Sequence, residues 1–165
     1  MDPFKIFIVE DDELYGAMLR HHLSLNPDNE VELFTNGKDF IKNLYKNPSM
    51  ISLDYRLPDM TGMEVLQRIK EYDTEIPVVI VSGQEDVGTA VDLLKKGVYD
   101  YFVKDDDTKN RLWNTVKNIK EHKDLKQELN ELKEEIGKKY EYSKVIKGNS
   151  IAIKKVFSLI EKATK

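Results

Sequence analysis

Pro77-Val78-Val79-Ile80-Val81-Ser82-Gly83 (residues 77–83) is the stretch that decides the fold class of this chain. Its first five residues are all apolar, without the polar alternation of a strand that has one face in water. Such runs are typical of parallel strands covered by helices on both faces. Ser82-Gly83 ends the run, and helical spacing of apolar residues then extends from Val87 to Leu94. The stretch therefore predicts one strand–helix unit of an α/β fold.

The same unit recurs on both sides of this stretch. Strands are predicted at residues 5–9, 31–34, 50–53, 77–81 and 99–103, and helices at residues 14–25, 37–46, 63–69, 87–94 and around 112–119. In the first helix, the spacing of Leu14, Met18, Leu19 and Leu23 predicts one buried side. Five alternations at these spacings suit right-handed βαβ crossovers. The fold predicted for residues 1–120 is a doubly wound, five-stranded parallel sheet with helices on both faces.

Composition limits the remaining classes. With 165 residues, 40% of them hydrophobic, the chain has room for one full domain and a smaller attachment. The absence of cysteine excludes disulfides and cysteine-ligated zinc. No apolar run approaches a membrane span and residues 1–5 do not resemble a signal peptide, so we expect a cytoplasmic protein without a membrane partner. The net charge of −4 gives no general attraction for nucleic acid.

In doubly wound sheets ligands bind outside the carboxyl ends of the strands, and here the residues directly after the predicted strands are chemically distinctive. They are Glu10 and Asp11 after the first strand, Asp54 after the third, Ser82 after the fourth and Lys104 after the fifth. Clustered carboxylates repel one another unless a cation is present, and hard oxygen ligands suit Mg²⁺. A carboxylate can also attack a phosphoryl group, while Mg²⁺ and an ammonium balance the charge and a hydroxyl donates a hydrogen bond. The pattern predicts an acyl-phosphate site, and no nucleotide-binding loop accompanies it.

Four stretches around these strand ends resemble one known family, the receiver domain of two-component response regulators. They are IFIVEDDELY at residues 6–15, ISLDYRLPDMTG at 51–62, PVVIVSGQ at 77–84 and GVYDYFVK at 97–104, and the resemblance covers residues 4–122. Each stretch alone is a weak signal, but together and in this order they are highly specific. The resemblance implies a flavodoxin-like domain that accepts a phosphoryl group from a sensor histidine kinase or a phosphotransfer protein and switches an output domain. It implies a signalling domain rather than an enzyme, with at most self-phosphorylation from small donors and autodephosphorylation.

The resemblance also implies a separate role for each acidic residue of the site. Asp54 would be the phosphoacceptor. Glu10 and Asp11 would be the acid pair that holds Mg²⁺, with Asp11 the more direct ligand. The backbone carbonyl of Arg56 would complete the protein ligands of the metal, and the Arg56 side chain would influence how long the phosphoryl group survives.

The remaining site residues implied by the resemblance lie on the last two strands and the loops that follow them. Ser82 and Lys104 would hold the phosphoryl oxygens, Tyr101 would be the switch aromatic, and Gln84 would influence the phosphoryl lifetime. The family usually has a proline after the lysine, joined by a cis peptide, whereas Asp105 follows here. Because a cis bond without proline costs about 2.5–4 kcal/mol, we predict a trans Lys104–Asp105 peptide.

Several of these patterns have plainer interpretations. Asp12 and Glu13 are interpreted as the cap and first turn of a helix, and residues 105–107 likewise, because a calcium loop would need a glycine and a terminal glutamate. His21 and His22 are interpreted as surface residues and Trp113 as a packing residue, and Tyr101 is alternatively a core residue. Two other classes remain: a phosphatase with Asp54 as nucleophile, disfavoured because Arg56 stands where a second acid is needed, and a phosphorylation-independent binding module, which would more naturally have lost part of the site.

From Glu121 the sequence changes to a heptad pattern. Leu125, Leu129, Leu132 and Ile136 repeat at spacings of 4, 3 and 4, with Glu121 and Glu128 at g positions and Lys126 and Lys133 at e positions. We predict a coiled-coil linker over residues 121–140 and a parallel homodimer through residues 121–136; the alternative is a lone amphipathic helix lying on the domain. Extended backwards, the seam includes Thr115, Asn118 and His122.

Residues 141–165 contain VIKGNSIAIKKVFSLIEKATK, which resembles the opening of the AAA+ module of NtrC-like activators that work with the alternative sigma factor. The chain stops before any phosphate-binding glycine loop, so no ATPase is expected here. The resemblance suggests part of a longer transcriptional regulator, which would contact DNA and the sigma factor only through domains absent from this chain.

Overall fold

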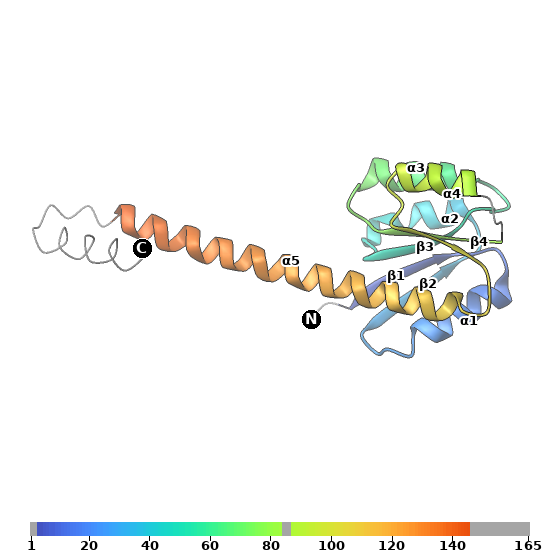
Figure 1. Cartoon of the computed structure of the whole chain (residues 1–165), viewed down its shortest axis with the longest axis horizontal. Helices are drawn as coiled ribbons and strands as arrows, with labels where there is room; N and C mark the ends of the chain where they lie inside the picture. Colours follow the sequence, from blue (N-terminus) through green and yellow to red (C-terminus); the bar gives the residue numbers. More distant parts are fainter. Residues whose placement is uncertain (1–2, 84–86, 146–165) are drawn as a thin grey trace, which may run out of the picture. The chain divides into compact units, whose positions relative to one another are not determined.

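The computed structural model describes residues 3–83 and 87–145. These residues contain a five-stranded sheet in which all neighbouring strands are parallel, in the order β2-β1-β3-β4-β5 (Figure 1). The strands are β1 (Phe4–Val9), β2 (Asn29–Phe34), β3 (Met50–Asp54), β4 (Val78–Ser82) and β5 (Asp100–Val103). The predicted doubly wound parallel sheet is confirmed.

Helices cover both faces of the sheet (Figure 1). On one face lie α1 (Glu13–Leu23) and the first part of α5 (Thr108–Val145), and on the other lie α2 (Gly37–Lys42), α3 (Gly62–Tyr72) and α4 (Val87–Lys95). Successive side chains of a strand point to opposite faces. In β1, Ile6 and Ile8 therefore belong to the core on the α1–α5 side, whereas Phe7 and Val9 belong to the core on the α2–α4 side.

Strand β4 shows why the sequence lacks alternation there. Val78, Val79, Ile80 and Val81 are all 1% exposed or less, two in each core. Full burial of such a side chain contributes about 1.5–3 kcal/mol, so both faces of this central strand favour apolar residues. A polar residue at any of the four positions would leave a buried group without water.

The first helix turns a different side to the sheet from the one predicted. Leu19 and Leu23 are buried as predicted, but Leu14 is 86% exposed and Met18 is 39% exposed. At about 100° per residue, Leu14 lies roughly 140° around the helix from Leu19. The inward side is completed instead by Gly16, where an added Cβ would lie only 2.8 Å from a methyl group of Leu33 in β2.

The second helix is shorter than predicted. It ends at Lys42, and a separate 3₁₀ turn (η1, Leu44–Lys46) follows it. The amide of the Asn43 side chain donates to the carbonyl of Asp39, and Asn47 then takes a left-handed conformation with φ of 54°. The Asn43 side-chain bond lies at the point where α2 ends, four residues before the predicted stop, and the left-handed Asn47 ends the 3₁₀ turn at that stop.

In the first part of α5, Leu112, Val116 and Ile119 are buried against the sheet, and Trp113 packs beside them. Thr115 is also buried, at 6% exposure, so its predicted place on an outward seam is wrong. It lies about 40° from Ile119 on the helical wheel, at the edge of the buried stripe, and its hydroxyl donates to the carbonyl of Arg111.

The chain divides into two units, Met1–Glu121 and His122–Lys165. The resemblance to an AAA+ opening falls almost wholly on residues 146–165, which lie outside the described residues. In the described ranges, no helix combines the length and the apolar character needed to cross a bilayer.

Candidate functional site

The predicted site residues meet at one edge of the sheet. Asp54 and Ser82 are the last residues of β3 and β4, while Glu10 and Lys104 directly follow β1 and β5. Because all strands are parallel, these four residues share the carboxyl edge, and β1 and β3 are neighbours at the point where the strand order reverses. The fold therefore confirms the prediction that these residues converge, although Glu10 and Lys104 are 94 residues apart in sequence.

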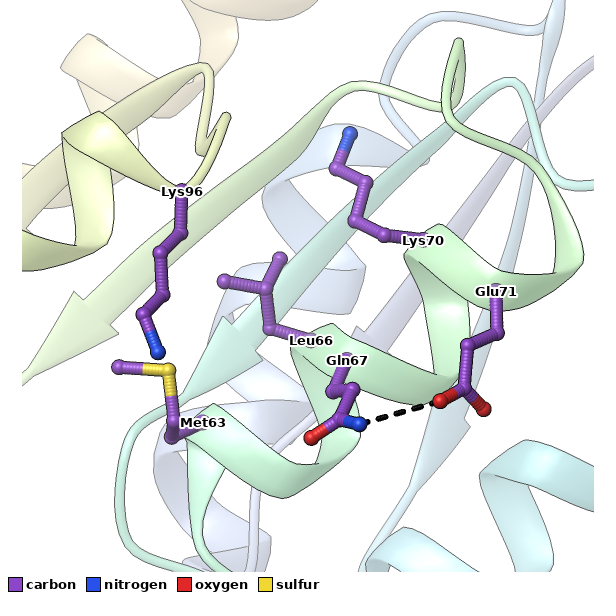
Figure 2. Close-up of a pocket in the computed structure, with 6 residues that line it drawn as sticks. All are labelled: Met63, Leu66, Gln67, Lys70, Glu71 and Lys96. Atoms are coloured by element: carbon purple, nitrogen blue, oxygen red, sulfur yellow. Dashed lines mark hydrogen bonds between the residues drawn. The ribbon is translucent and has the colours of Figure 1, made fainter.

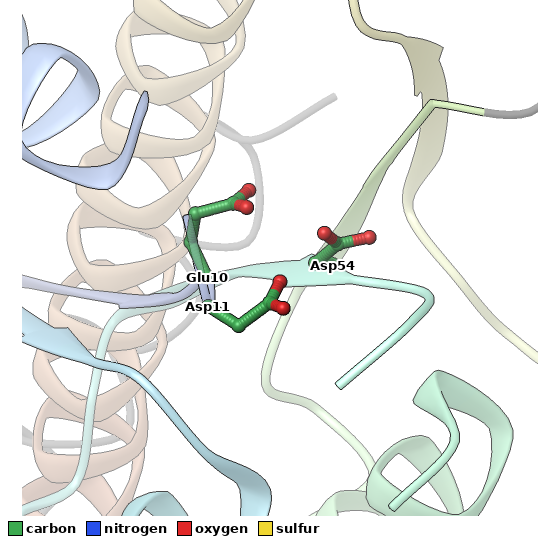
Figure 3. Close-up of side chains that lie close together, drawn as sticks. All are labelled: Glu10, Asp11 and Asp54. Atoms are coloured by element: carbon green, nitrogen blue, oxygen red, sulfur yellow. The ribbon is translucent and has the colours of Figure 1, made fainter. Parts of the chain in front are cut away.

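Three carboxylates form the centre of the site. Glu10, Asp11 and Asp54 each offer an oxygen atom, and these atoms all lie within 4.8 Å of one another (Figure 3). Glu10 is 1% and Asp54 is 7% exposed, whereas Asp11 is open to solvent. With metal–oxygen distances of about 2.1 Å, oxygens around one Mg²⁺ ion lie roughly 3–4 Å apart. Small side-chain rotations would bring these oxygens to that spacing, so the donor set fits Mg²⁺.

Lys104 forms ion pairs with both buried carboxylates. Its Nζ atom lies 2.8 Å from Glu10 Oε1 and 2.8 Å from Asp54 Oδ2. Burial by itself would lower the pKa of Lys104, but the hydrogen bonds to Asp54 and Glu10 outweigh it and raise the pKa above its ordinary value. The ammonium therefore stays charged and holds the cluster together.

Glu10 has the most perturbed titration of the site. Burial raises its pKa from the ordinary 4.5 to about 7, the charge of Asp54 adds to the rise, and the hydrogen bond from Lys104 opposes it. A glutamate of this kind is half-protonated near neutral pH, so a cation that binds the ionised form has to displace its proton.

Tyr15 is a neighbour of the site that the sequence interpretation missed. Its ring lies 4.8 Å from the Lys104 Nζ atom, in a cation–π arrangement. Burial raises the pKa of its phenol. The available signal was its position in α1, four residues before the buried Leu19, which places both residues on the same side of the helix. The predicted buried side included Leu14 instead.

The loop after β3 is closed by short backbone contacts. The Gly62 amide donates to the Tyr55 carbonyl at 2.7 Å, and Arg56 and Thr61 form an isolated antiparallel bridge. An added Cβ on Gly62 would lie 2.7 Å from the Cα atom of Tyr55, so this close approach requires glycine. The loop holds Arg56 next to Asp54, whose Oδ1 accepts a hydrogen bond from the Arg56 amide at 3.1 Å.

A second missed residue, Asp59, ties this loop to α2. Its two carboxylate oxygens accept from the amides of Gly37 and Lys38, at 2.8 and 2.9 Å. Burial would raise the pKa of Asp59, but these backbone bonds outweigh it and lower the pKa. The sequence pattern carries no sign of this bond, because its partners lie more than 20 residues away.

Ser82 and Tyr101 lie on the neighbouring strands β4 and β5. Ser82 is buried, and its carbonyl accepts from the Lys104 amide at 2.8 Å. Tyr101 pairs with Ile80 in the sheet register and is half-buried against the core on the α2–α4 side. Gln84 lies outside the described residues.

The plainer interpretations are largely confirmed. Asp12 caps α1 by accepting from the amides of Leu14 and Tyr15, both at 3.0 Å. His21 is exposed as predicted, whereas His22 is half-buried and packs edge-on against Trp113, with ring centroids 5.4 Å apart. None of the peptide bonds within the described ranges is cis, which confirms the trans Lys104–Asp105 prediction.

A surface cavity of about 410 Å³ lies elsewhere on the domain (Figure 2). Its lining comes from α3 and from the residue directly after α4: Met63, Leu66, Gln67, Lys70, Glu71 and Lys96. No residue of the carboxylate cluster lines it, so it is not the site predicted from the strand ends.

The fold and the site together define a class of protein. Residues 6–117 match the response regulator receiver domain, and the chain belongs to this family. Its function is that of a receiver, a two-component signalling domain that is switched by phosphorylation.

Individual relatives agree with this assignment. Regulatory protein LuxO of Vibrio cholerae is 30% identical over 157 residues, which cover 94% of this chain and 33% of LuxO. Response regulator protein TodT of Pseudomonas putida is 31% identical over 104 residues, which cover 60% of this chain and 44% of TodT. The chain thus spans about a third of the length of LuxO.

Solved structures agree as well. The signal receiver domain of a putative LuxO repressor protein from Vibrio parahaemolyticus has a TM-score of 0.71 at 26% identity, covering 77% of this chain and 97% of that one. The BeF₃-activated receiver domain of DrrB from Thermotoga maritima has a TM-score of 0.66 at 27% identity, covering 72% of this chain and 98% of that one.

Proposed function

We propose that Asp54 is the phosphorylated residue and that a histidine kinase or a phosphotransfer protein is the donor. The observation that carries this proposal is the position of the Asp54 carboxylate. It is buried at the carboxyl edge of the sheet, 2.8 Å from one ammonium and within 4.8 Å of oxygens from two other carboxylates. Such a site supplies a nucleophile and the charge balance that phosphoryl transfer needs.

In the proposed reaction, an Asp54 oxygen attacks the phosphorus atom of a phosphohistidine. A phosphorus–oxygen bond forms, the phosphorus–nitrogen bond of the donor breaks, and the leaving imidazole nitrogen takes up a proton from solvent. Lys104 moves from its present pair of carboxylates to the phosphoryl oxygens, and the Ser82 hydroxyl donates a hydrogen bond to one of them. No other group of this chain forms a covalent bond.

Glu10, Asp11, Asp54 and the backbone carbonyl of Arg56 would hold Mg²⁺. When bound, Mg²⁺ neutralises the negative charge that the carboxylates and the phosphoryl group bring together. The tight loop from Tyr55 to Gly62 supports this assignment, because it keeps the Arg56 backbone beside Asp54.

Ser82 and Tyr101 would carry the change from the site to the surface. Because β4 and β5 are hydrogen-bonded neighbours, a shift at the end of β4 acts directly on the strand that carries Tyr101. Phosphorylation would bias an equilibrium between two packings of the surface formed by α4 and β5.

The test of this proposal is incubation of the whole chain with acetyl phosphate and Mg²⁺, followed by intact-mass analysis. We expect one added phosphoryl group, lost in Asp54→Asn. Asp12→Asn is the matched control, since asparagine also caps helices, and it should be phosphorylated like the unaltered chain. An adduct that persists in Asp54→Asn would contradict the assignment.

We further propose that residues 121–136 form a parallel homodimer. Leu125, Leu129, Leu132 and Ile136 are each between 50% and 57% exposed on one stripe of α5. A second copy of the same stripe would cover them, with Glu121 facing Lys126 and Glu128 facing Lys133. The buried Thr115 restricts the seam to residues after it, and two heptads give modest affinity.

We propose transcription activation as the output of the longer protein, from the resemblance alone. Since the chain matches only a third of LuxO, transcription activation through an AAA+ module, DNA and a sigma factor would require parts that the matched segment does not include. A cytoplasmic location follows from the proposed donor, because two-component phosphotransfer takes place in the cytoplasm.

A further inference from the structure

Lys104 stands at the point where the chain leaves the sheet. Its own amide donates to the Ser82 carbonyl at 2.8 Å, which holds it on the sheet side. On the other side come three consecutive exposed acids, residues 105–107, before α5 begins. The position of the Lys104 backbone therefore depends on how firmly this short acidic loop is held.

Asp105 is exposed, but several hydrogen bonds hold it in place. Its Oδ2 accepts from Arg111 Nη2 at 2.6 Å, and its Oδ1 accepts from the Asp107 amide at 2.9 Å and from the Thr108 hydroxyl at 3.1 Å. The Asp105 amide donates in turn to the Thr108 oxygen at 2.9 Å. The bond from Arg111, with those from Thr108 and Asp107, lowers the pKa of Asp105 despite partial desolvation.

The same two α5 residues also hold the residue before Lys104. The carbonyl of Val103 accepts from Arg111 Nη2 at 3.0 Å, and the one hydroxyl proton of Thr108 is shared between this carbonyl, at 3.0 Å, and Asp105 Oδ1. The guanidinium lies over the Phe102 ring, 5.0 Å from its centroid. Both chain neighbours of Lys104 are thus bonded to the first turn of α5.

The side-chain contacts of Lys104 cannot hold the lysine in position throughout the reaction. Its present partners are Glu10 and Asp54, and these are the groups that the metal and the phosphoryl group would engage. The bonds of Asp105, Thr108 and Arg111 involve neither of them and can persist through the transfer.

We propose that Asp105 is a positioning residue for Lys104: with Thr108 and Arg111 it fixes the backbone on both sides of the lysine, so that the ammonium meets the phosphoryl oxygens. This inference rests on the proposed function, in which Lys104 contacts the phosphoryl group. Small misplacements of a catalytic group can reduce a rate by up to about a hundredfold. Loss of one anchor among several should slow phosphorylation roughly tenfold.

The experiment uses the whole chain with Mg²⁺ and a series of acetyl phosphate concentrations, with phosphorylation followed by intact mass. Asp105→Ala should lower the rate at saturating donor and leave the half-saturating donor concentration unchanged. The matched control is Asp106→Ala, which removes the same charge from the next position of the loop, and it should leave the rate unchanged. A rate in Asp105→Ala equal to that of the unaltered chain would overturn the inference.

A double-mutant cycle separates positioning from a general structural role. If Asp105 acts through Lys104, then Asp105→Ala should have no further effect in a chain that already carries Lys104→Ala. An equal slowing in both backgrounds would overturn the inference while leaving the function intact. If the unaltered chain is not phosphorylated, or Lys104→Ala is as fast, the proposed function itself fails.

Discussion

Replacing Glu10 by glutamine should make the metal-free chain more stable, although it removes an ion pair. The pKa of Glu10 rises from 4.5 in the unfolded chain to about 7 in the folded one. The folded state therefore binds this proton more tightly, and stability falls as pH rises from about 4.5 to about 7. Above pH 7 the carboxylate is ionised in the folded state, and its burial lowers the free energy of unfolding by the full amount. The glutamine side chain resembles the neutral acid and escapes this cost.

The magnitude follows from the same pKa values. At about 1.4 kcal/mol per pKa unit, the rise corresponds to roughly 3 kcal/mol. Glu10 is only 1% exposed, so solvent screening reduces this little. We expect Glu10→Gln to be more stable than the unaltered chain by about 3 kcal/mol at pH 8 and by only about 1 kcal/mol at pH 5.

The assay is urea unfolding between pH 5 and pH 8 in the presence of a chelator. Trp113, the single tryptophan, packs against the sheet and reports on the receiver unit by fluorescence. Glu30→Gln, at an exposed position, is the matched control and should change stability by no more than about 0.5 kcal/mol. Adding Mg²⁺ at pH 8 should stabilise the unaltered chain more than the variant, since the metal binds the ionised carboxylate. A Glu10→Gln variant that is less stable at pH 8, or whose advantage does not shrink toward pH 5, would refute the reasoning.

Three further predictions concern the metal, the lysine and the linker. Asp11→Ala should weaken Mg²⁺ binding and slow phosphorylation by acetyl phosphate much more than Asp12→Ala, which removes a helix cap; the opposite order would place the acid pair one residue out. Tyr15→Leu removes the ring beside the Lys104 ammonium and should slow phosphorylation several-fold. Tyr15→Phe should keep the rate of the unaltered chain, because the cation–π contact needs only the ring. Equal rates in all three proteins would show that the ring does not support Lys104. In sedimentation velocity, Leu129→Lys with Leu132→Lys should shift the chain toward monomer, while the control Gln127→Lys with Asn130→Lys adds the same charge outside the seam and should not; identical sedimentation of both variants and the unaltered chain would show that the linker does not join the dimer.

The sequence by itself determined the fold class and the groups that meet in the site. The reason is that a parallel sheet gathers the residues after every strand at one edge, so strand ends read in order already place Glu10, Asp54, Ser82 and Lys104 together. The PVVIV run, which lacks polar alternation, predicted a buried parallel strand, because a strand covered on both faces has apolar residues at every position.

Only the tertiary structure decided how the side chains pack and bond across elements. The helical pattern of α1 predicted a buried side that included Leu14 and Met18, whereas the fold buries Gly16, Leu19 and Leu23, with Gly16 packed closely against the Leu33 side chain. The bond of Asp59 to α2 joins segments that no local pattern relates. The Asp105 network is different: residues within one short stretch make it, but its geometry depends on where β5 ends and α5 begins. Periodicity reports which residues repeat on a face, whereas the choice of partner for each face is made by packing in three dimensions.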